Sequence, residues 1–488
     1  MIGSKQFTID ATDFVKGMTT SANIRDGGFS NETVGVNLIA NPGVIYGGNT
    51  MVNRTSNLVN GNVIMSCGDA TYLGAQKFFG TDTGYFYSMD GAYTVTARQS
   101  AVTGTWTQGY SDMVQFSYGG NAYTFATNTT DVVRMTGSTL TSLDATWWTG
   151  TLGMTALGVN PIGGATGVTT AHPMLVFEDA LWIGDFNKLH KWDGTTASYS
   201  FLTLPIDQTI IALGIDPSTG KMLISTTQGA NASNTVPKIC KVLLWDGFST
   251  RPIRSVIVDD MVTAIYPVGG TVFMPFGQSL GYWNGAGVTF LRRFKNVTLD
   301  ATQLVYKHKM TSIGRNLYIA DGVQALCYGE ILPGEKKFYY ATKATTGSPT
   351  VVTCMLNLGN NQLGMAYFDG GDKIIASYDV YSTTLANNLC LFYTSKYEFK
   401  KKILVKEVVV EYQDSIAAAG SGGIITLIDE KGEASPNATL TNGQSAAVYE
   451  MSFFPPQVVP ASNFCQFKYE PVSAKGVRRF IVSYDEIE

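Results

Sequence analysis

The chain has 488 residues, of which 44% are hydrophobic and 12% aromatic, so it is long enough for about two or three domains and can bury a large core. Only 15% of the residues are charged and the net charge is −4, without a basic stripe, which argues against nucleic-acid binding and against long charged helices. The sequence contains no run of about 18 apolar residues, so no membrane span is expected.

Residues 1–60 are predicted to form an extended arm. This segment has many turn residues and few continuous strand patterns, yet it contains several large apolar side chains. Such side chains are expected to be covered by protein, so the arm should lie along the rest of the molecule or along a neighbouring subunit. The residues that we assign to this assembly interface are Phe7, Phe14, Phe29 and Leu38.

Residues 61–398 repeat one unit, in which a short apolar run leads into a turn that contains glycine. Asp-Gly and Asn-Gly accept the positive φ angles of a two-residue hairpin turn, which most residues resist. Each unit of about 40 to 55 residues holds about four strands, which is the size of one β-propeller blade. The turns stand at Asp90-Gly91, Thr136-Gly137, Asp193-Gly194, Asp246-Gly247 and Asn284-Gly285.

The number of units predicts a β-propeller of about seven blades. A four-stranded blade has two apolar faces, and stacking blades around an axis buries both of them. A tryptophan precedes three of the turns, at Trp192, Trp245 and Trp283, and we expect these side chains to pack between adjacent blades. Three other tryptophans, Trp106, Trp147 and Trp148, are candidates for stacking on sugar rings, although packing between blades is favoured for them as well.

Residues 399–488 predict a small β-sandwich that follows the propeller with little linker. The stretch KKILVKEVVVEYQD alternates apolar and polar residues and places Leu404, Val408, Val410 and Tyr412 on one face of a strand. Further short strand patterns follow, among them GSGGIITLIDEKGEA and GVRRFIVSYDEIE. Five or more alternating strands in about 90 residues are typical of two antiparallel sheets packed face to face.

The sequence offers no convincing catalytic or metal-binding pattern. The six cysteines form no Cys-x-x-Cys pair, and the three histidines, His172, His190 and His308, are far apart in the sequence, which argues against a zinc site. The segment GIDPSTGKM has five rather than four residues between Gly214 and Gly220, so it fits a hairpin turn better than a phosphate-binding loop. We therefore predict no catalytic residue, no cofactor and no metal, and a protein that is not an enzyme.

The N-terminal segment resembles the beginnings of bacteriophage tail proteins, through Lys16-Gly17, Asn37-Leu38 and Pro42-Gly43. The blade sequence HPMLVFEDALWIGDFNKLHKWDGTT, residues 172–196, is similar to the propeller repeats of phage tail nozzle and tail hub proteins. A C-terminal β-sandwich that begins with a Lys-rich strand is also similar to such proteins. The resemblance implies a virion protein that forms part of a tail tube or nozzle, and no functional residue can be transferred from it.

We therefore predict a structural component of a phage tail, such as a nozzle, a hub or a ring around the DNA exit channel. It would act through subunit contacts in a homo-oligomeric ring and contact other tail, portal or adaptor proteins, without sequence-specific nucleic-acid recognition. The first residues lack the charged start and apolar stretch of a signal peptide, which fits assembly in the host cytoplasm. Two alternatives stay open: a carbohydrate- or receptor-binding propeller, and a glycoside hydrolase or lyase.

Overall fold

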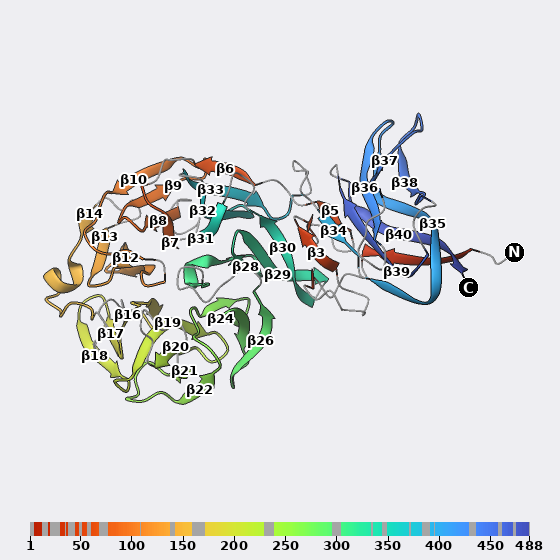
Figure 1. Ribbon diagram of the computed structural model, residues 1–488. Coiled ribbons are helices and arrows are strands. Elements are labelled where there is room, and N and C mark those ends of the chain that lie inside the picture. Colours follow the sequence, from red (N-terminus) through yellow and green to blue (C-terminus); the bar gives the residue numbers. More distant parts are fainter. Residues whose placement is uncertain are drawn as a thin grey trace.

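The chain folds into a seven-bladed β-propeller followed by a curled C-terminal sheet (Figure 1). The predicted all-β class and the predicted number of blades are confirmed. Among the described residues, two short helical turns are also found, η2 (Trp147–Thr151) and η3 (Lys307–Lys309). The computed structural model describes residues 4–11, 18–19, 30–34, 36–37, 44–47, 51–55, 60–67, 77–107, 109–136, 142–158, 171–228, 239–294, 304–332, 335–343, 349–369, 372–382, 391–394, 396–428, 436–456, 461–471 and 475–487.

Each of the first six blades is an antiparallel sheet of four strands that follow one another along the chain. The first strand of a blade lies near the propeller axis and the fourth lies on the rim (Figure 1). Blades 1 to 3 consist of β7 (Val63–Cys67), β8 (Lys77–Thr81), β9 (Phe86–Met89) and β10 (Val95–Gln99); β11 (Met113–Tyr118), β12 (Asn121–Thr127), β13 (Val132–Thr136) and β14 (Ser142–Asp144); and β15 (Met174–Phe177), β16 (Ala180–Asp185), β17 (Lys188–Trp192) and β18 (Ala197–Thr203). Blades 4 to 6 consist of β19 (Gln208–Asp216), β20 (Lys221–Gln228), β21 (Ile239–Trp245) and β22 (Arg254–Val258); β23 (Tyr266–Val268), β24 (Thr271–Phe276), β25 (Ser279–Trp283) and β26 (Val288–Arg293); and β27 (Met310–Ile313), β28 (Asn316–Asp321), β29 (Gln324–Leu332) and β30 (Glu335–Lys343).

The seventh blade closes the ring with a strand from the N-terminal segment. Its three inner strands are β31 (Pro349–Gly359), β32 (Gln362–Asp369) and β33 (Asp372–Asp379), and β6 (Val52–Thr55) pairs with β33 as the outermost strand. Arg54 supports this contact, because its Nε donates to Ser377 Oγ at 2.7 Å. The boundary expected at residue 60 therefore differs from the structure, in which part of the predicted arm is a propeller strand. Four residues of strand are too few to be recognised without their partner.

The glycine-containing turns connect the third and fourth strands of successive blades. Gly194, Gly247 and Gly285 have φ angles of 97°, 90° and 85°, as the sequence predicted. The predicted loop length is wrong, because Trp192 pairs with Ala197 and Trp283 with Val288, which leaves four residues in each loop. The polar residue before each glycine explains the longer loop, since its side chain accepts hydrogen bonds from later backbone N–H groups and holds the turn.

The tryptophan before each turn packs against the preceding blade, as predicted. Trp192 of blade 3 lies 5.6 Å from Phe125 of blade 2, and Trp245 of blade 4 lies 5.2 Å from Trp182 of blade 3, both measured between ring centroids. Trp283 of blade 5 donates its Nε1–H toward a carboxylate of blade 4 at 3.3 Å. Each repeated tryptophan thus stabilises the contact between neighbouring blades, because its packing there removes a large apolar area from water.

The C-terminal sheet is one hydrogen-bonded sheet that curls on itself, rather than two separate layers. Its longest strand, β35 (Tyr397–Ile416), pairs with β40 (Val477–Ile487), with β38 (Val448–Phe453) and, near its start, with β39 (Ser462–Glu470). β39 continues the sheet to β36 (Ser421–Ile428) and β37 (Ala438–Thr441) on one side, and to β34 (Leu391–Tyr393) on the other. The alternating pattern predicted the strands. The long β35 pairs with β38, β39 and β40, and these pairings join the two halves into one hydrogen-bonded sheet.

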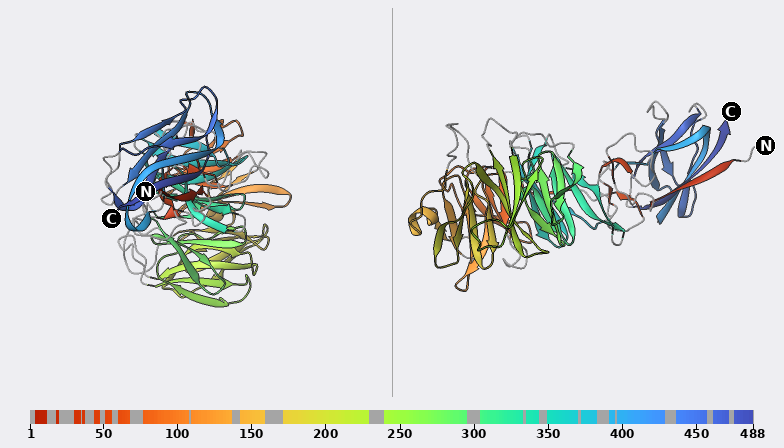
Figure 2. Two further views of the ribbon diagram at one scale, coloured as in Figure 1. Left: turned by 90° about the vertical axis from the view of Figure 1, so that its right-hand side faces the viewer. Right: turned by 90° about the horizontal axis from the view of Figure 1, so that it is seen from below.

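The N-terminal segment also completes the C-terminal sheet. β1 (Lys5–Asp10) pairs with β40 along its whole length, and β3 (Ser30–Val34) pairs with β34 and β2 (Met18–Thr19). β4 (Val36–Asn37) and β5 (Tyr46–Gly47) form a separate two-stranded sheet. Both chain ends therefore lie at the C-terminal sheet, at the far end of the molecule from blades 2 and 3 (Figure 2). Among the described residues, no helix has the length and apolar character needed to cross a membrane.

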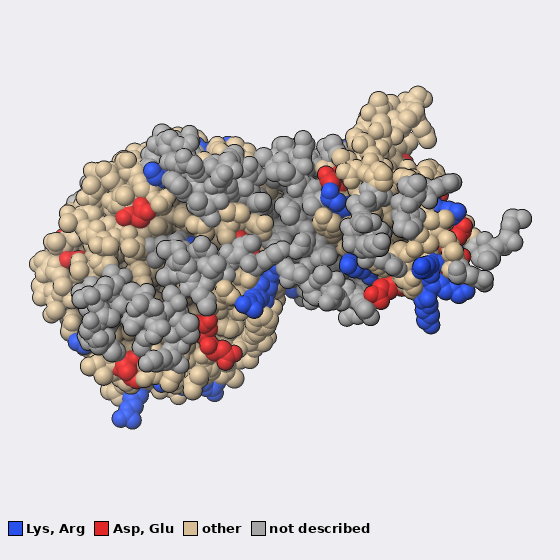
Figure 3. Space-filling model, in the orientation of Figure 1, with Lys and Arg blue, Asp and Glu red and all other residues tan. Residues whose placement is uncertain are grey.

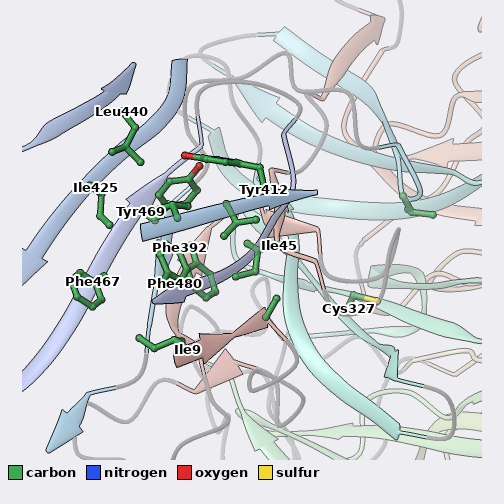
Figure 4. Close-up of a cluster of buried hydrophobic side chains, with 14 of the residues drawn as sticks. Ile9, Ile45, Cys327, Phe392, Tyr412, Ile425, Leu440, Phe467, Tyr469 and Phe480 are labelled. Carbon is green, nitrogen blue, oxygen red and sulfur yellow. The ribbon is translucent and has the colours of Figure 1, made fainter. Parts of the chain in front are cut away.

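One buried cluster joins the C-terminal sheet to the last two blades. Figure 4 shows Phe480, Tyr469 and Phe392 of the sheet, together with Ile9 of β1 and Cys327 of blade 6, as members of this cluster. The side chains of Tyr412 and Tyr469 both donate to the backbone carbonyl of Gly422. A continuous core of this kind means that the two parts stabilise each other rather than fold as unconnected units.

Candidate functional site

The inner strands surround a cavity on the propeller axis, which we call the axial cavity. Its volume is about 490 Å³, which is in the range of about 300–1,000 Å³ that small-molecule sites occupy. Met113, Met174 and Met310 form part of its wall, and Gln115 and Tyr266 add polar groups. The lining comes from six of the seven blades, so the cavity exists only because the ring is closed.

The floor of the axial cavity is a charged cluster that crosses the propeller axis. Asp112 stands just before β11, and its two carboxylate oxygens each accept a hydrogen bond from Lys307 Nζ at 3.0 Å. His308 Nε2 donates to the same carboxylate at 2.8 Å, and so does the Met174 backbone N–H, also at 2.8 Å. His308 Nδ1 accepts from the Ser66 backbone N–H at 3.3 Å. The cluster Asp112, Lys307 and His308, here the axial lock, thereby connects blades 1, 2, 3 and 6.

The electrostatics of the axial lock favour one charge state. Burial alone would raise the pKa of Asp112, but the Lys307 ammonium and the hydrogen bond from His308 outweigh burial and hold this pKa well below its ordinary value. The imidazole of His308 is neutral in this arrangement, because its Nδ1 accepts from a backbone N–H while its Nε2–H donates to Asp112. The lock is therefore an ion pair of Asp112 and Lys307 with a neutral histidine beside it.

The axial lock closes the propeller axis. A second cavity shares Lys307 and His308 with the axial cavity as lining residues, and Asp112 lines this second cavity alone. Its volume is about 30 Å³, the space of roughly one water molecule. The propeller axis is therefore a cavity with a floor and not an open pore.

The chemistry available in the axial cavity is limited. Its carboxylate, ammonium and imidazole already bind one another in the lock. The thiol of Cys67 lies in the wall, and desolvation raises its pKa to about 12, so it is protonated and a poor nucleophile at neutral pH. In the part of the chain that the structure describes, no group of three or more His, Cys, Asp or Glu side chains is arranged to hold a metal ion. That the protein is not an enzyme stays a prediction.

Two histidines that are separate in the sequence meet at one carboxylate in blade 3. His190 Nε2 bonds Asp185 at 3.1 Å, and His172 Nδ1 lies 3.8 Å from the same carboxylate. Both imidazoles are fully buried, and burial lowers the pKa of His172 despite the nearby carboxylate. The Ser200 backbone N–H donates to His190 Nδ1 at 2.8 Å. This cluster has no open face, so it acts as a polar part of the core.

The three tryptophans considered for sugar stacking do not offer a ring face to solvent. Trp106 is 3% exposed, and Trp147 and Trp148 are 0% exposed. Trp147 packs against Trp192 of blade 3 at a centroid distance of 4.8 Å, and Trp148 Nε1 donates to the Thr155 backbone carbonyl. A sugar ring needs an accessible aromatic face, so these side chains are packing residues and the stacking hypothesis is wrong for them.

Of the four residues assigned to an assembly interface, Phe7 lies among the described residues, and Phe14, Phe29 and Leu38 lie outside them. Phe7 is half-buried on β1 and packs against Tyr397 at a centroid distance of 5.4 Å. It is therefore in contact with the C-terminal sheet of its own chain. An interface between subunits was expected for this position, and the structure gives it a partner within the chain.

A second candidate site, which sequence reasoning missed, lies on the propeller rim. Eight of the thirteen exposed large hydrophobic side chains among the described residues belong to blades 3 to 5 and their connections. Phe248 and Ile257 are the most exposed on blade 4, at 74% and 73%. Alternation along the outer strands gave no signal, because exposure depends on which face a neighbouring blade covers. We define the outer apolar band as Tyr199, Phe201, Phe248, Ile253, Ile257 and Phe290.

Comparisons with known proteins identify no family for this chain. No protein-family model matches the chain, and no curated protein does. Among solved structures, the chain is similar to YCF48 bound to D1 peptide, with 9% identity and a TM-score of 0.42 over 67% of this chain and 96% of that chain. It is also similar to the extracellular domain of a one-component system of B. thetaiotaomicron, with 11% identity and a TM-score of 0.41 over 82% of this chain and 47% of that chain, less than half its length.

Proposed function

We propose that this protein is a structural subunit of a bacteriophage tail that acts through contacts with other subunits, as part of a ring around the DNA channel. The outer apolar band carries the proposal. Large apolar side chains gathered on one part of a surface are costly in water and usually mark a protein–protein contact. The assignment to a phage tail comes from the resemblance of the N-terminal segment and the blade sequence to tail proteins.

The two ends of the molecule suit a head-to-tail ring. A ring of identical subunits needs two different surfaces that fit each other. The outer apolar band lies on the rim of blades 3 to 5, whereas blades 6 and 7 carry the C-terminal sheet (Figure 1). The low share of charged residues, 15% in the whole chain, also suits extensive contacts.

Because the propeller axis is closed, a DNA channel would have to run between subunits. The axial lock fills the axis with the side chains of Asp112, Lys307 and His308, so a duplex cannot pass through one propeller. A channel must therefore be enclosed by several copies arranged in a ring. This requirement makes the oligomeric state the property that decides for or against the proposal.

The test compares the native mass of the full chain with that of a rim variant, by native mass spectrometry and electron microscopy over a range of concentrations. The wild-type chain should form closed rings. The double variant Phe248→Asp/Ile257→Asp should be monomeric, because it places two charges in the outer apolar band. Thr96→Asp, at an exposed position on the rim strand β10 of blade 1, is the matched control and should assemble like the wild type. A monomeric wild type, or a rim variant that still assembles, overturns the proposal.

One specific observation favours a second candidate, a carbohydrate-binding propeller. The axial cavity has the volume of a small-molecule site and presents the polar side chains of Gln115 and Tyr266. A glycan array with the wild-type chain tests this candidate. Binding that is lost in Gln115→Ala, while the melting temperature is unchanged, would favour it. An array without any binder would remove it.

A further inference from the structure

A groove of about 550 Å³ lies between strands β37 and β38 of the C-terminal sheet. The loop that joins these strands is held by Asn442, whose side-chain amide donates to the backbone carbonyls of Ile416, Ala417 and Ala446. From this point the two strands follow different halves of the sheet, since β37 pairs with β36 and β38 pairs with β35. Figure 1 shows both strands projecting at the upper end of the C-terminal sheet.

Both strands beside this groove are edges. Among the described strands, β37 pairs with β36 alone and β38 with β35 alone, so each has a row of backbone N–H and C=O groups without a ladder partner. Natural proteins usually protect such edges with charges, prolines or bulges. Here Glu450 is the one charged side chain among the described lining residues, while Tyr449 and Phe454 are 58% and 67% exposed. The upper tip of this projection shows no charged side chain in Figure 3.

The groove specifies the chemistry of its occupant. Open backbone edges bind an extended strand by adding it to the sheet. Phe454 favours a strand with an apolar side chain, and Glu450 favours one with a cation near it. A small molecule could not satisfy a row of backbone groups over the length of β38.

We propose that the groove binds strand β22 of a second copy of this chain, which adds to the open edge of β38. β22 is the outermost strand of blade 4 and pairs with β21 alone among the described strands. Its Ile257 belongs to the outer apolar band, and Arg251 and Arg254 beside it are exposed cations that complement Glu450. This inference rests on the proposed function, because it names the surface that meets the outer apolar band in the ring.

The two surfaces belong to different copies. β22 lies at the bottom of the propeller in Figure 1, and β37 and β38 lie at the top of the C-terminal sheet, so they cannot meet within one chain. A contact between two different surfaces is heterologous, and repeating it generates a closed ring or a filament. Strand addition would fix the register of that contact through backbone hydrogen bonds, as the ladders within each blade do.

The experiment is disulfide cross-linking between two single-cysteine variants of the full chain. Ser452→Cys places a thiol at an exposed position of β38, and Ser255→Cys places one at an exposed position of β22. Under mild oxidation, the mixture should form a cross-linked dimer at least about tenfold faster than the control mixture of Ser452→Cys with Thr96→Cys, because contact raises the effective thiol concentration. The wild-type chain under the same oxidant gives the background from native cysteines.

The outcomes separate this inference from the proposed function. If the wild type forms rings but the β38–β22 pair cross-links no faster than the control pair, the inference is wrong and the ring stands. If the wild type is monomeric at every concentration, the proposed function fails and the inference fails with it.

Charge reversal gives a second readout. Glu450→Arg and Arg254→Glu should each weaken assembly at least about threefold, and the double variant should restore most of it; equal losses in all three variants would contradict the pairing.

Discussion

The propeller and the C-terminal sheet consist of the same kind of strand, but they are assembled in different ways. In blades 1 to 6 each strand pairs with its neighbour in the sequence, whereas β1 pairs with β40 and Lys5 bonds Glu486, 481 residues away. A local hairpin closes only a short loop. Two strands that are far apart in the sequence must close a long loop, at a cost in chain entropy, before their pairing contributes to stability. The N-terminal segment links the two regions, because β6 closes the ring and β1 extends the C-terminal sheet.

The largest expected effect comes from the core that the two regions share. Phe480 is 0% exposed and packs edge-on against Tyr469, within the cluster that continues into blades 6 and 7. Phe480→Ala should lower the free energy of unfolding by about 3–5 kcal/mol, because it leaves a cavity in place of a buried ring. Chemical denaturation followed by tryptophan fluorescence measures this loss, since all seven tryptophans of the chain precede residue 284 and therefore report on the propeller.

The matched control is Phe290→Ala, because Phe290 is a 58% exposed phenylalanine on the rim. Its removal should change the unfolding free energy by no more than about 0.5 kcal/mol. If Phe480→Ala left the fluorescence transition of the propeller unchanged while the C-terminal sheet melted, the two regions would be energetically independent. The two regions would then be in contact through the shared cluster without stabilising each other.

The difference between the two regions also explains what the sequence could predict. Blade hairpins were predictable because Trp192, Trp245 and Trp283 each stand before a turn that is built locally. The role of β6 was not predictable, because four residues of strand carry no pattern without β33 beside them. The axial lock was missed for a similar reason, since Asp112 and Lys307 belong to no motif and are separated by 195 positions in the sequence. Contacts between distant blades become visible only in the closed ring.

The next largest loss of stability is expected when the axial lock is broken. This change tests the stability of the propeller alone. Asp112→Ala removes the acceptor for Lys307, His308 and the Met174 backbone N–H together. We expect a loss of about 2–4 kcal/mol in unfolding free energy, at the lower end for a buried ion pair because Lys307 is partly solvated. Lys307→Met should cost less, because the carboxylate keeps its other donors. Equal losses in the two variants would show that the carboxylate does not organise the lock.

The pH dependence of the unfolding free energy tests the same contribution of the ionised Asp112 carboxylate. The pKa of Asp112 is held well below its ordinary value in the folded chain, whereas an unfolded Asp titrates near about 3.9. A depressed folded pKa contributes stability in full above the unfolded pKa, and this contribution is lost as the pH falls from about 4 through the folded pKa. Urea midpoints measured from pH 6 to 2.5 should therefore fall more steeply for the wild type than for Asp112→Asn. Parallel curves would show that Asp112 does not titrate with folding.

The smallest effect tests whether each blade turn is held locally. Asn284 accepts hydrogen bonds from the backbone N–H groups of Ala286 and Gly287 at 2.9 and 2.8 Å, and its own amide donates to Thr289 Oγ1. Asn284→Ala should lower the unfolding free energy by about 0.5–1.5 kcal/mol, measured by urea denaturation, because the exposed turn loses its side-chain acceptor. Asn284→Asp is the control and should recover most of the loss, since Asp193 and Asp246 fill the same position in blades 3 and 4. If Asn284→Asp cost as much as Asn284→Ala, the acceptor would not be what holds the turn, and the repeated Trp-Asp-Gly sequence would owe its role to the tryptophan alone.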